Sequence, residues 1–176
     1  MTNSPCAPAA MSNPVVDFIS HSVAQTQRIG ARLGELLRPS DVILLEGDFG
    51  SGKTCLAQGI ARGLGLGLLV NSPTFTLINE YPSRDYGSRL TLYHIDAYRL
   101  SQPVAELLDL GIDDYLYGQG VCVVEWAERV VTLMPPDHLA IKLKFISETK
   151  RGIRMEPSGN RYVGLLHEFR KRAFGR

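Results

Sequence analysis

The pattern of apolar and polar residues predicts strands and helices in alternation along the chain. In the first part, a short strand is followed by a capped helix, a continuous apolar run typical of a buried strand, and a second helix. These elements are expected over residues 15–19, 22–38, 41–46 and 54–62. The first helix opens with a capping box at Ser22 and Gln25, and Pro39 ends it.

The second part predicts a hairpin, a short helix, a buried strand, a half-exposed strand with a short partner, and a basic amphipathic helix. The expected ranges are 77–81 with 90–96, then 103–110, 121–125, 139–145 with 153–155, and 161–176. Residues 111–120 are acidic and contain tyrosines, and this segment is expected to be irregular. Residues 1–14 are rich in Pro, Ala, Ser and Asn, which predicts a disordered tail.

Length and composition indicate a single globular domain over residues 15–176. Of the 176 residues, 44% are hydrophobic and 21% are charged, as in ordinary globular proteins. No apolar run approaches the ~20 residues that a membrane-spanning helix needs, and the N-terminus lacks the pattern of a secretory signal. The three cysteines show no C-x-x-C spacing and are typical of reduced thiols. We therefore expect a cytoplasmic protein without a membrane anchor.

The net charge of +1 conceals an uneven distribution. From Asp137 onward there are ten Lys and Arg against four Asp and Glu, a balance of +6, whereas residues 1–136 have nine against fourteen, or −5. This basic C-terminal extension could meet nucleic acid or an acidic partner, or it could be a solvated face without a ligand. The sequence leaves both interpretations open.

Residues 47–54 fit the phosphate-binding pattern G-x-x-x-x-G-K-[ST], and they stand between a predicted buried strand and a predicted helix. Glycines let successive backbone N–H groups turn toward phosphate oxygens, and the helix dipole favours an anion at the same place. Lys53 would reach the β- and γ-phosphates, and the Thr54 hydroxyl would hold Mg²⁺. The predicted nucleotide-binding residues are Asp48, Phe49, Gly50, Ser51, Gly52, Lys53 and Thr54.

Two acidic residues stand at the ends of predicted strands. Asp96 would emerge where open α/β sheets bind ligands, although a capping or solvent-facing carboxylate is the alternative. Glu125 follows four apolar residues, an arrangement that delivers a carboxylate to Mg²⁺ or to the attacking water. The adjacent Trp126 would close over the nucleotide, contact a partner or pack in the core. His94 is expected to be a hydrogen-bonded structural residue.

Hydroxyl groups provide two further candidates. Thr74 lies in the turn 72–76, which Pro73 fixes, and it could sense the terminal phosphate or position water. A turn that only satisfies its own backbone is the alternative. Thr26, near the start of the first helix, could touch the base or the ribose, with plain surface exposure as the alternative.

These motifs together resemble a known family, the bacterial ATPase of tRNA threonylcarbamoyladenosine biosynthesis, of the TsaE type. The resemblance covers residues 20–155 and leaves out the tail and the basic end. It lies in the phosphate loop, S-P-T-F-T at 72–76, H-I-D-A-Y-R-L at 94–100, G-I-D-D-Y at 111–115 and E-W at 125–126. This order of motifs is highly specific. Ser51 departs from the alanine often found at its position, a change that should leave the loop intact.

The resemblance implies a P-loop NTPase-like three-layer α/β sandwich with a mixed, mostly parallel sheet in one domain. It implies ATP hydrolysis with Mg²⁺, in support of two sugar-kinase-like subunits that attach threonylcarbamoyl to the adenosine next to the tRNA anticodon. Turnover would reset that complex, and any contact with tRNA would be indirect. By position, Lys53 would bind phosphate, Thr54 and Glu125 would hold Mg²⁺, and Asp96 would support hydrolysis. Thr74 and Trp126 would line the catalytic side.

Two other functions are compatible with a phosphate loop. A small-molecule kinase would need an arginine-bearing lid, for which only the turn 83–89 offers itself. A nucleotide-gated binding module would use ATP to order a docking surface, with incidental turnover. A GTPase and an ABC-type ATPase are disfavoured, because the sequence lacks N-K-x-D, D-x-x-G and L-S-G-G-Q.

Overall fold

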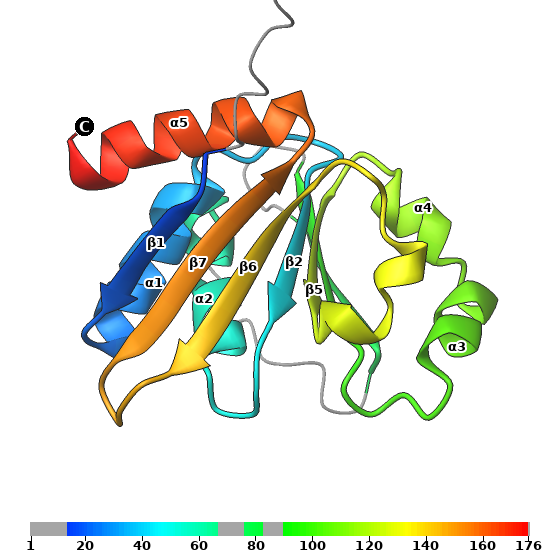
Figure 1. Ribbon diagram of the computed structural model, residues 1–176. Helices are drawn as coiled ribbons and strands as arrows, with labels where there is room; N and C mark the ends of the chain where they lie inside the picture. The colour runs from blue at the N-terminus through cyan, green and yellow to red at the C-terminus, as the bar shows by residue number, and fades with distance from the viewer. Residues whose placement is uncertain (1–13, 67–75, 83–89, 176) are drawn as a thin grey trace, which may run out of the picture.

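The computed structural model describes residues 14–66, 76–82 and 90–175, and its centre is one seven-stranded sheet (Figure 1). The strands lie in the order β1-β7-β6-β2-β5-β4-β3. In chain order they are β1 Val16–Ser20, β2 Val42–Glu46, β3 Ile78–Pro82, β4 Thr91–Asp96, β5 Val121–Glu125, β6 His138–Phe145 and β7 Arg151–Ser158. The four central strands β6, β2, β5 and β4 are parallel, whereas β1, β7 and β3 join antiparallel. The expected mixed sheet with a parallel centre is confirmed.

Helices cover both faces of this sheet (Figure 1). They are α1 Val23–Gly34, α2 Lys53–Gly63, α3 Pro103–Asp109, α4 Ile112–Leu116 and α5 Asn160–Phe174, with the 3₁₀ turns η1 Ala127–Arg129 and η2 Val131–Leu133. Residues of α1, α2 and α5 pack in one apolar cluster, and residues of α3 and α4 pack in another. Alternate residues of β2 enter the two clusters, Ile43 and Leu45 the first, Val42 and Leu44 the second. The three layers expected from the sequence are therefore present.

The first helix begins as the sequence predicts. The Ser22 hydroxyl accepts a hydrogen bond from Gln25 N at 3.1 Å, and the Gln25 side chain accepts one from His21 N at 2.7 Å. The regular helix, however, ends at Gly34, four residues before the expected end. Its last turn is continued by single backbone bonds at Glu35, Leu36 and Leu37.

The segment 111–120 differs from its prediction, because it contains α4. Gly111, with a φ of 70°, begins this helix, and Ile112 and Leu116 project from one side of it into the second apolar cluster. A single buried pair within an acidic segment gives too weak a periodicity to indicate a helix.

The basic C-terminal segment is part of the domain. Tyr162, Leu166 and Phe169 of α5 are buried in the first cluster, and the Tyr162 hydroxyl accepts a hydrogen bond from Val42 N at 2.6 Å. The Arg161 guanidinium donates to the Asp41 carboxylate at 2.6 Å and to Leu36 O at 3.0 Å. Part of the positive charge counted in the sequence therefore holds α5 against β2. Within the described ranges, no helix has the length and apolar character needed to cross a membrane.

Glycines bring α1 and α2 into backbone contact, which fixes the position of α2 and of the loop before it. A Cβ added at Gly59 would overlap the carbonyl oxygen of Gln27, and one added at Gly63 would overlap that of Ala31. The two helices thus pack closer than side chains would allow.

We predict that Gly59→Ala destabilises the protein by about 1–3 kcal/mol, the usual cost of overpacking. The direction of the change in stability identifies the close packing, because Gly→Ala inside a helix normally stabilises a protein by up to about 1 kcal/mol. Gly164→Ala in α5 is the matched control, since a Cβ there meets nothing within 4 Å. Chemical denaturation of both variants measures the difference. Equal stabilisation of both would contradict the proposed packing.

Candidate nucleotide-binding site

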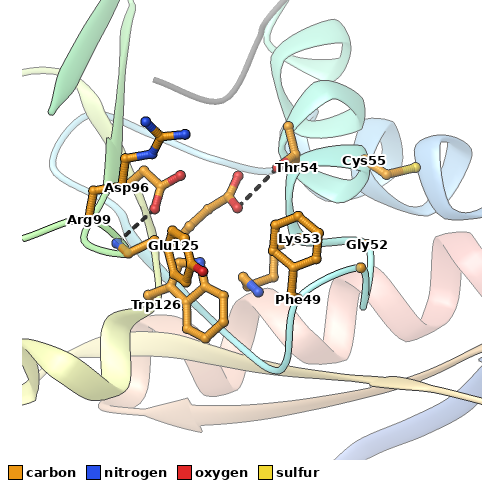
Figure 2. A pocket seen from close by; sticks show the side chains of 11 residues that line it. Phe49, Gly52, Lys53, Thr54, Cys55, Asp96, Arg99, Glu125 and Trp126 are labelled. Carbon is orange, nitrogen blue, oxygen red and sulfur yellow. Dashed lines mark hydrogen bonds between the residues drawn. The ribbon is translucent and has the colours of Figure 1, made fainter. Parts of the chain in front are cut away.

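A pocket of about 450 Å³ opens at the carboxyl ends of β2, β5 and β4, beside the N-terminus of α2 (Figure 2). Among the described residues, its lining comes from three places in the sequence: the phosphate loop with the first turn of α2, the end of β4 with the segment after it, and the end of β5 with the residue that follows it. The lining residues are Phe49, Gly50, Gly52, Lys53, Thr54, Cys55, Asp96, Tyr98, Arg99, Glu125 and Trp126. Open α/β sheets bind ligands at this edge.

The phosphate loop has the backbone conformation that its glycines allow. Gly47, Gly50 and Gly52 have φ values of 136°, 74° and 101°, which residues other than glycine rarely adopt. Gly47 is also crowded, because a Cβ there would overlap the carbonyl oxygen of Leu143 on β6. Gly52 precedes α2 without any side-chain cap, so the first N–H groups of the helix are left for another acceptor.

Lys53 is held at the mouth of this loop and is only 5% exposed. Its ammonium donates to Gly47 O at 2.6 Å and to Asp48 O at 3.0 Å, and it lies 3.8 Å from the centroid of the Trp126 ring. Burial lowers the pKa of Lys53, while the nearby carboxylates, Glu125 foremost, oppose that change. The charged form would be favoured further by an anion in the pocket.

Glu125 links the two halves of the site. Its Oε2 accepts a hydrogen bond from the Thr54 hydroxyl at 3.1 Å, and its Oε1 lies 2.9 Å from His94 Nε2 (Figure 2 shows the first bond). Glu125 is 2% exposed and His94 is fully buried. In the described part of the chain, His94 Nδ1 has no hydrogen-bond partner, whereas Nε2 faces a carboxylate oxygen and donates to it. His94 is thus the hydrogen-bonded structural residue that was expected.

The strand register brings the second acid beside the first. Asp96 of β4 pairs directly with Glu125 of β5 in the parallel ladder, and both side chains line the pocket. Asp96 Oδ1 also accepts a hydrogen bond from Tyr98 N at 2.9 Å. Asp96 therefore both caps the backbone of the following segment and lines the pocket.

Three aromatic rings line the pocket entrance. The ring centroids of Trp126 and Tyr98 are 4.9 Å apart, and those of Tyr98 and Phe49 are 6.2 Å apart. Phe49 is 82% exposed and Tyr98 is 48% exposed. Trp126 thus packs partly against the second apolar cluster and partly against the site, rather than in the core alone.

Comparison with known proteins identifies the family. A family model described as "Threonylcarbamoyl adenosine biosynthesis protein TsaE" matches residues 20–153. The chain belongs to the TsaE family. The tRNA threonylcarbamoyladenosine biosynthesis protein TsaE of Bacillus subtilis is 43% identical over 82% of this chain and 87% of its own length. The protein of that name from Treponema pallidum is 41% identical over 77% and 96%. The crystal structure of B. subtilis YdiB superposes with a TM-score of 0.76 at 34% identity, covering 93% of this chain and 99% of that one.

Not every predicted site residue of this TsaE-family chain lines the pocket. Asp48 contributes its carbonyl oxygen, and Ser51 is buried with a hydroxyl that lacks a partner among the described residues. Thr26 is neither exposed nor part of the lining: it is 2% exposed, and its hydroxyl is 2.8 Å from that of Ser20. This replaces the expectation of a surface residue with a buried pair between α1 and β1. Thr74 lies outside the described residues.

Three lining residues, Cys55, Tyr98 and Arg99, had no assigned role in the sequence. Cys55 follows Thr54 directly, and the other two follow Asp96, so their positions in the motifs were the available signal. Burial raises the pKa of the Cys55 thiol, which favours an unreactive side chain.

The residues present suit Mg²⁺ bound together with a nucleotide. Thr54, Glu125 and Asp96 offer the hard oxygen donors that Mg²⁺ prefers. Within the described ranges, no three His, Cys, Asp or Glu side chains form a metal site by themselves. Magnesium in such pockets usually relies on one or two protein oxygens, water and substrate phosphates. The donor set therefore fits a metal that arrives with phosphates.

We predict that His94→Leu destabilises the protein by about 1–3 kcal/mol, because it removes a donor from a buried carboxylate. His94→Gln should cost less, since its amide can still donate to Glu125. Thermal or urea unfolding measures both.

His167→Leu, at an exposed position of α5, is the control for the loss of an imidazole and should change the free energy of unfolding by less than about 0.5 kcal/mol. A His94→Leu variant as stable as the natural protein would disprove the role of this bond.

Proposed function

We propose that the protein is a Mg²⁺-dependent ATPase that supports threonylcarbamoyl modification of the adenosine next to the tRNA anticodon. The observation that carries the proposal is the convergence of Lys53, Thr54 and Glu125, with Asp96, in one pocket at the carboxyl edge of the sheet. Family membership supports the pathway, because the relatives are named for tRNA threonylcarbamoyladenosine biosynthesis.

The side chains of the pocket divide the work of hydrolysis. The loop N–H groups and Lys53 would bind the phosphates and neutralise the charge that develops during transfer. Thr54 and Glu125 would hold Mg²⁺, which supplies Lewis-acid stabilisation of phosphate oxygens when bound. Because the Thr54 hydroxyl donates to Glu125, its lone pairs remain for a cation. Asp96, on the neighbouring strand, would orient the attacking water.

The protein would act as an accessory to two sugar-kinase-like subunits that perform the transfer in the cytoplasm. Its contact with tRNA would be indirect. The exposed rings of Phe49 and Tyr98 support a partner-dependent activity, because they would let a docked protein sense the pocket. The same rings favour the second candidate, a nucleotide-gated binding module with incidental turnover.

Phosphate release separates these functions. It should be measured for the protein alone, then with the two partner subunits, and then with tRNA added. An accessory ATPase releases phosphate in step with formation of the modified nucleoside. Modification that proceeds equally well with a non-hydrolysable ATP analogue would favour the binding module, and stoichiometric phosphorylation of an acceptor would favour the kinase.

Lys53→Ala should weaken ATP binding on the order of 100-fold, since charge-assisted hydrogen bonds contribute about 1.5–3 kcal/mol. Isothermal titration calorimetry measures the affinity, and a melting curve checks folding. Lys144→Ala, at an exposed position of β6, is the matched control and should bind ATP normally. Unchanged affinity in the Lys53 variant would refute the assignment of the phosphate site.

Glu125→Gln should lower turnover by about 100-fold or more, because the neutral amide no longer supplies a carboxylate for the metal. It should also reduce the gain in ATP affinity that Mg²⁺ provides over EDTA. Glu148→Gln, at an exposed position, controls for the loss of a negative charge. Wild-type turnover in the Glu125 variant would show that this carboxylate is only structural.

A further inference from the structure

The pocket has a second cationic side chain that the mechanism above does not use. Among the described residues that line it, Lys53 and Arg99 are the basic ones. Lys53 comes from α2, whereas Arg99 comes from the segment after β4, beside Asp96 and across the pocket from Gly52 and Cys55 (Figure 2). The site is therefore flanked by positive charge on two sides.

The segment that carries Arg99 is fixed by the neighbouring wall. The Arg129 guanidinium, at the end of η1, donates to Ala97 O at 2.5 Å, to Leu100 O at 2.7 Å and to Tyr98 O. One side chain thus satisfies three carbonyls in four residues, using the forked donors that only arginine offers. The backbone around Arg99 is tied to the strand end that carries Glu125.

Two backbone N–H groups of the same segment are also bonded. Ala97 N donates to Glu125 O at 3.1 Å, and Tyr98 N donates to the Asp96 carboxylate. Ala97 and Leu100 are buried, whereas Tyr98 and Arg99 are exposed at the pocket. The segment therefore presents two side chains from an anchored backbone.

The charged side chains around Arg99 indicate a role for it in binding phosphate. Lys53 already donates to two loop carbonyls, and its ammonium has three donors in total. Asp96 and Glu125 add two carboxylates, so among the described lining side chains Lys53 and Arg99 together match the negative groups, and Mg²⁺ with the phosphates would add their own charges. Charge also develops on the terminal phosphoryl group during transfer, and an arginine is suited to bind it through two parallel hydrogen bonds.

We propose that Arg99 is a second phosphate-binding cation, directed at the terminal phosphate of ATP, and that Arg129 is the positioning residue that holds its segment. This inference rests on the proposed nucleotide site. Arg99 supplies, from within the same chain, the arginine that many phosphoryl-transfer enzymes take from a lid or from a partner.

The preference for ATP over ADP tests the role of Arg99, because only ATP carries the terminal phosphate. Calorimetry with ADP and a non-hydrolysable ATP analogue gives the ratio of the two dissociation constants. Arg99→Ala should reduce the preference for the ATP analogue about 10-fold or more, with little change in ADP affinity. Arg99→Lys should keep part of it. Arg28→Ala, an exposed arginine on α1, should leave the ratio unchanged.

The role of Arg129 is tested by a double-mutant cycle on the same ratio. Arg129→Lys retains the charge but cannot reach three carbonyls, so it should lower the ATP preference nearly as far as Arg99→Ala. Combining Arg129→Lys with Arg99→Ala should add little, because both changes remove one interaction. Additive losses, or an equal loss of ADP affinity, would overturn the positioning role; melting curves confirm that each variant is folded.

The outcomes test the proposed nucleotide site and the proposed role of Arg99 separately. If the natural protein binds neither nucleotide, the proposed function fails and the inference with it. If the natural protein prefers the ATP analogue and Arg99→Ala keeps that preference, the nucleotide site stands and the inference alone is wrong. Loss of the preference in Arg99→Ala, with the Arg28 control unchanged, supports it.

Discussion

The parallel pairing of β2 with β5 is the constraint on which the site depends. Leu45 of β2 is in register with Glu125 of β5, so the phosphate loop and the acid leave the sheet at the same edge. The bond between the Thr54 hydroxyl and the Glu125 carboxylate joins the two segments at 3.1 Å. A slip of one residue in this ladder would turn Glu125 to the opposite face, away from α2. It would also exchange the side chains that the two strands bury in the two closely packed cores.

The polar groups of the site stabilise one another in a nearly dry environment. Glu125, His94 and Lys53 are all buried, and an unpartnered charge in such a place would be costly. Each oxygen of Glu125 has its own donor, and Lys53 has two carbonyls and an aromatic ring. Removing any one of these partners would leave another group buried without its hydrogen bond, which lowers the free energy of unfolding. Stability and chemistry therefore depend on the same few hydrogen bonds.

The parts of this structure that the sequence predicted are those encoded by contiguous residues. The phosphate loop and Glu125 each follow a run of buried apolar residues, so their places could be inferred without tertiary information. The burial of Thr26 was not expected, because a hydroxyl gives the same sequence signal on the surface and in a buried pair with Ser20. The function of Arg129 could not be inferred, because its partners lie about thirty residues away and are backbone carbonyls that carry no sequence signal.

The charge count at the C-terminus likewise lacked tertiary information. The surplus of basic residues left two interpretations open, a surface for nucleic acid or an acidic partner, and a solvated face without a ligand. The structure pairs Arg161 with Asp41, which lies outside the segment, so this pair takes one positive charge out of the surplus; it also buries the apolar side of α5. Asp41 and Arg161 lie 120 residues apart in the sequence, so a count within one segment cannot reveal their pairing. A surplus in a segment becomes a surface property only after such pairs are removed.

Trp126 contacts both the phosphate-loop side of the pocket, at Lys53, and the segment after β4, at Tyr98. Its backbone conformation is strained. This residue has a φ of 57°, a conformation that costs a bulky side chain on the order of 1–3 kcal/mol and persists only when its surroundings impose it. The residues on either side supply the constraint: Glu125 O accepts from Ala97 N, and Arg129 binds the carbonyls of the segment after β4. The indole is thereby placed between the Lys53 ammonium and the Tyr98 ring. Because the strained backbone fixes the ring, the protein itself sets the distance between its phosphate loop and the wall that carries Asp96 and Arg99.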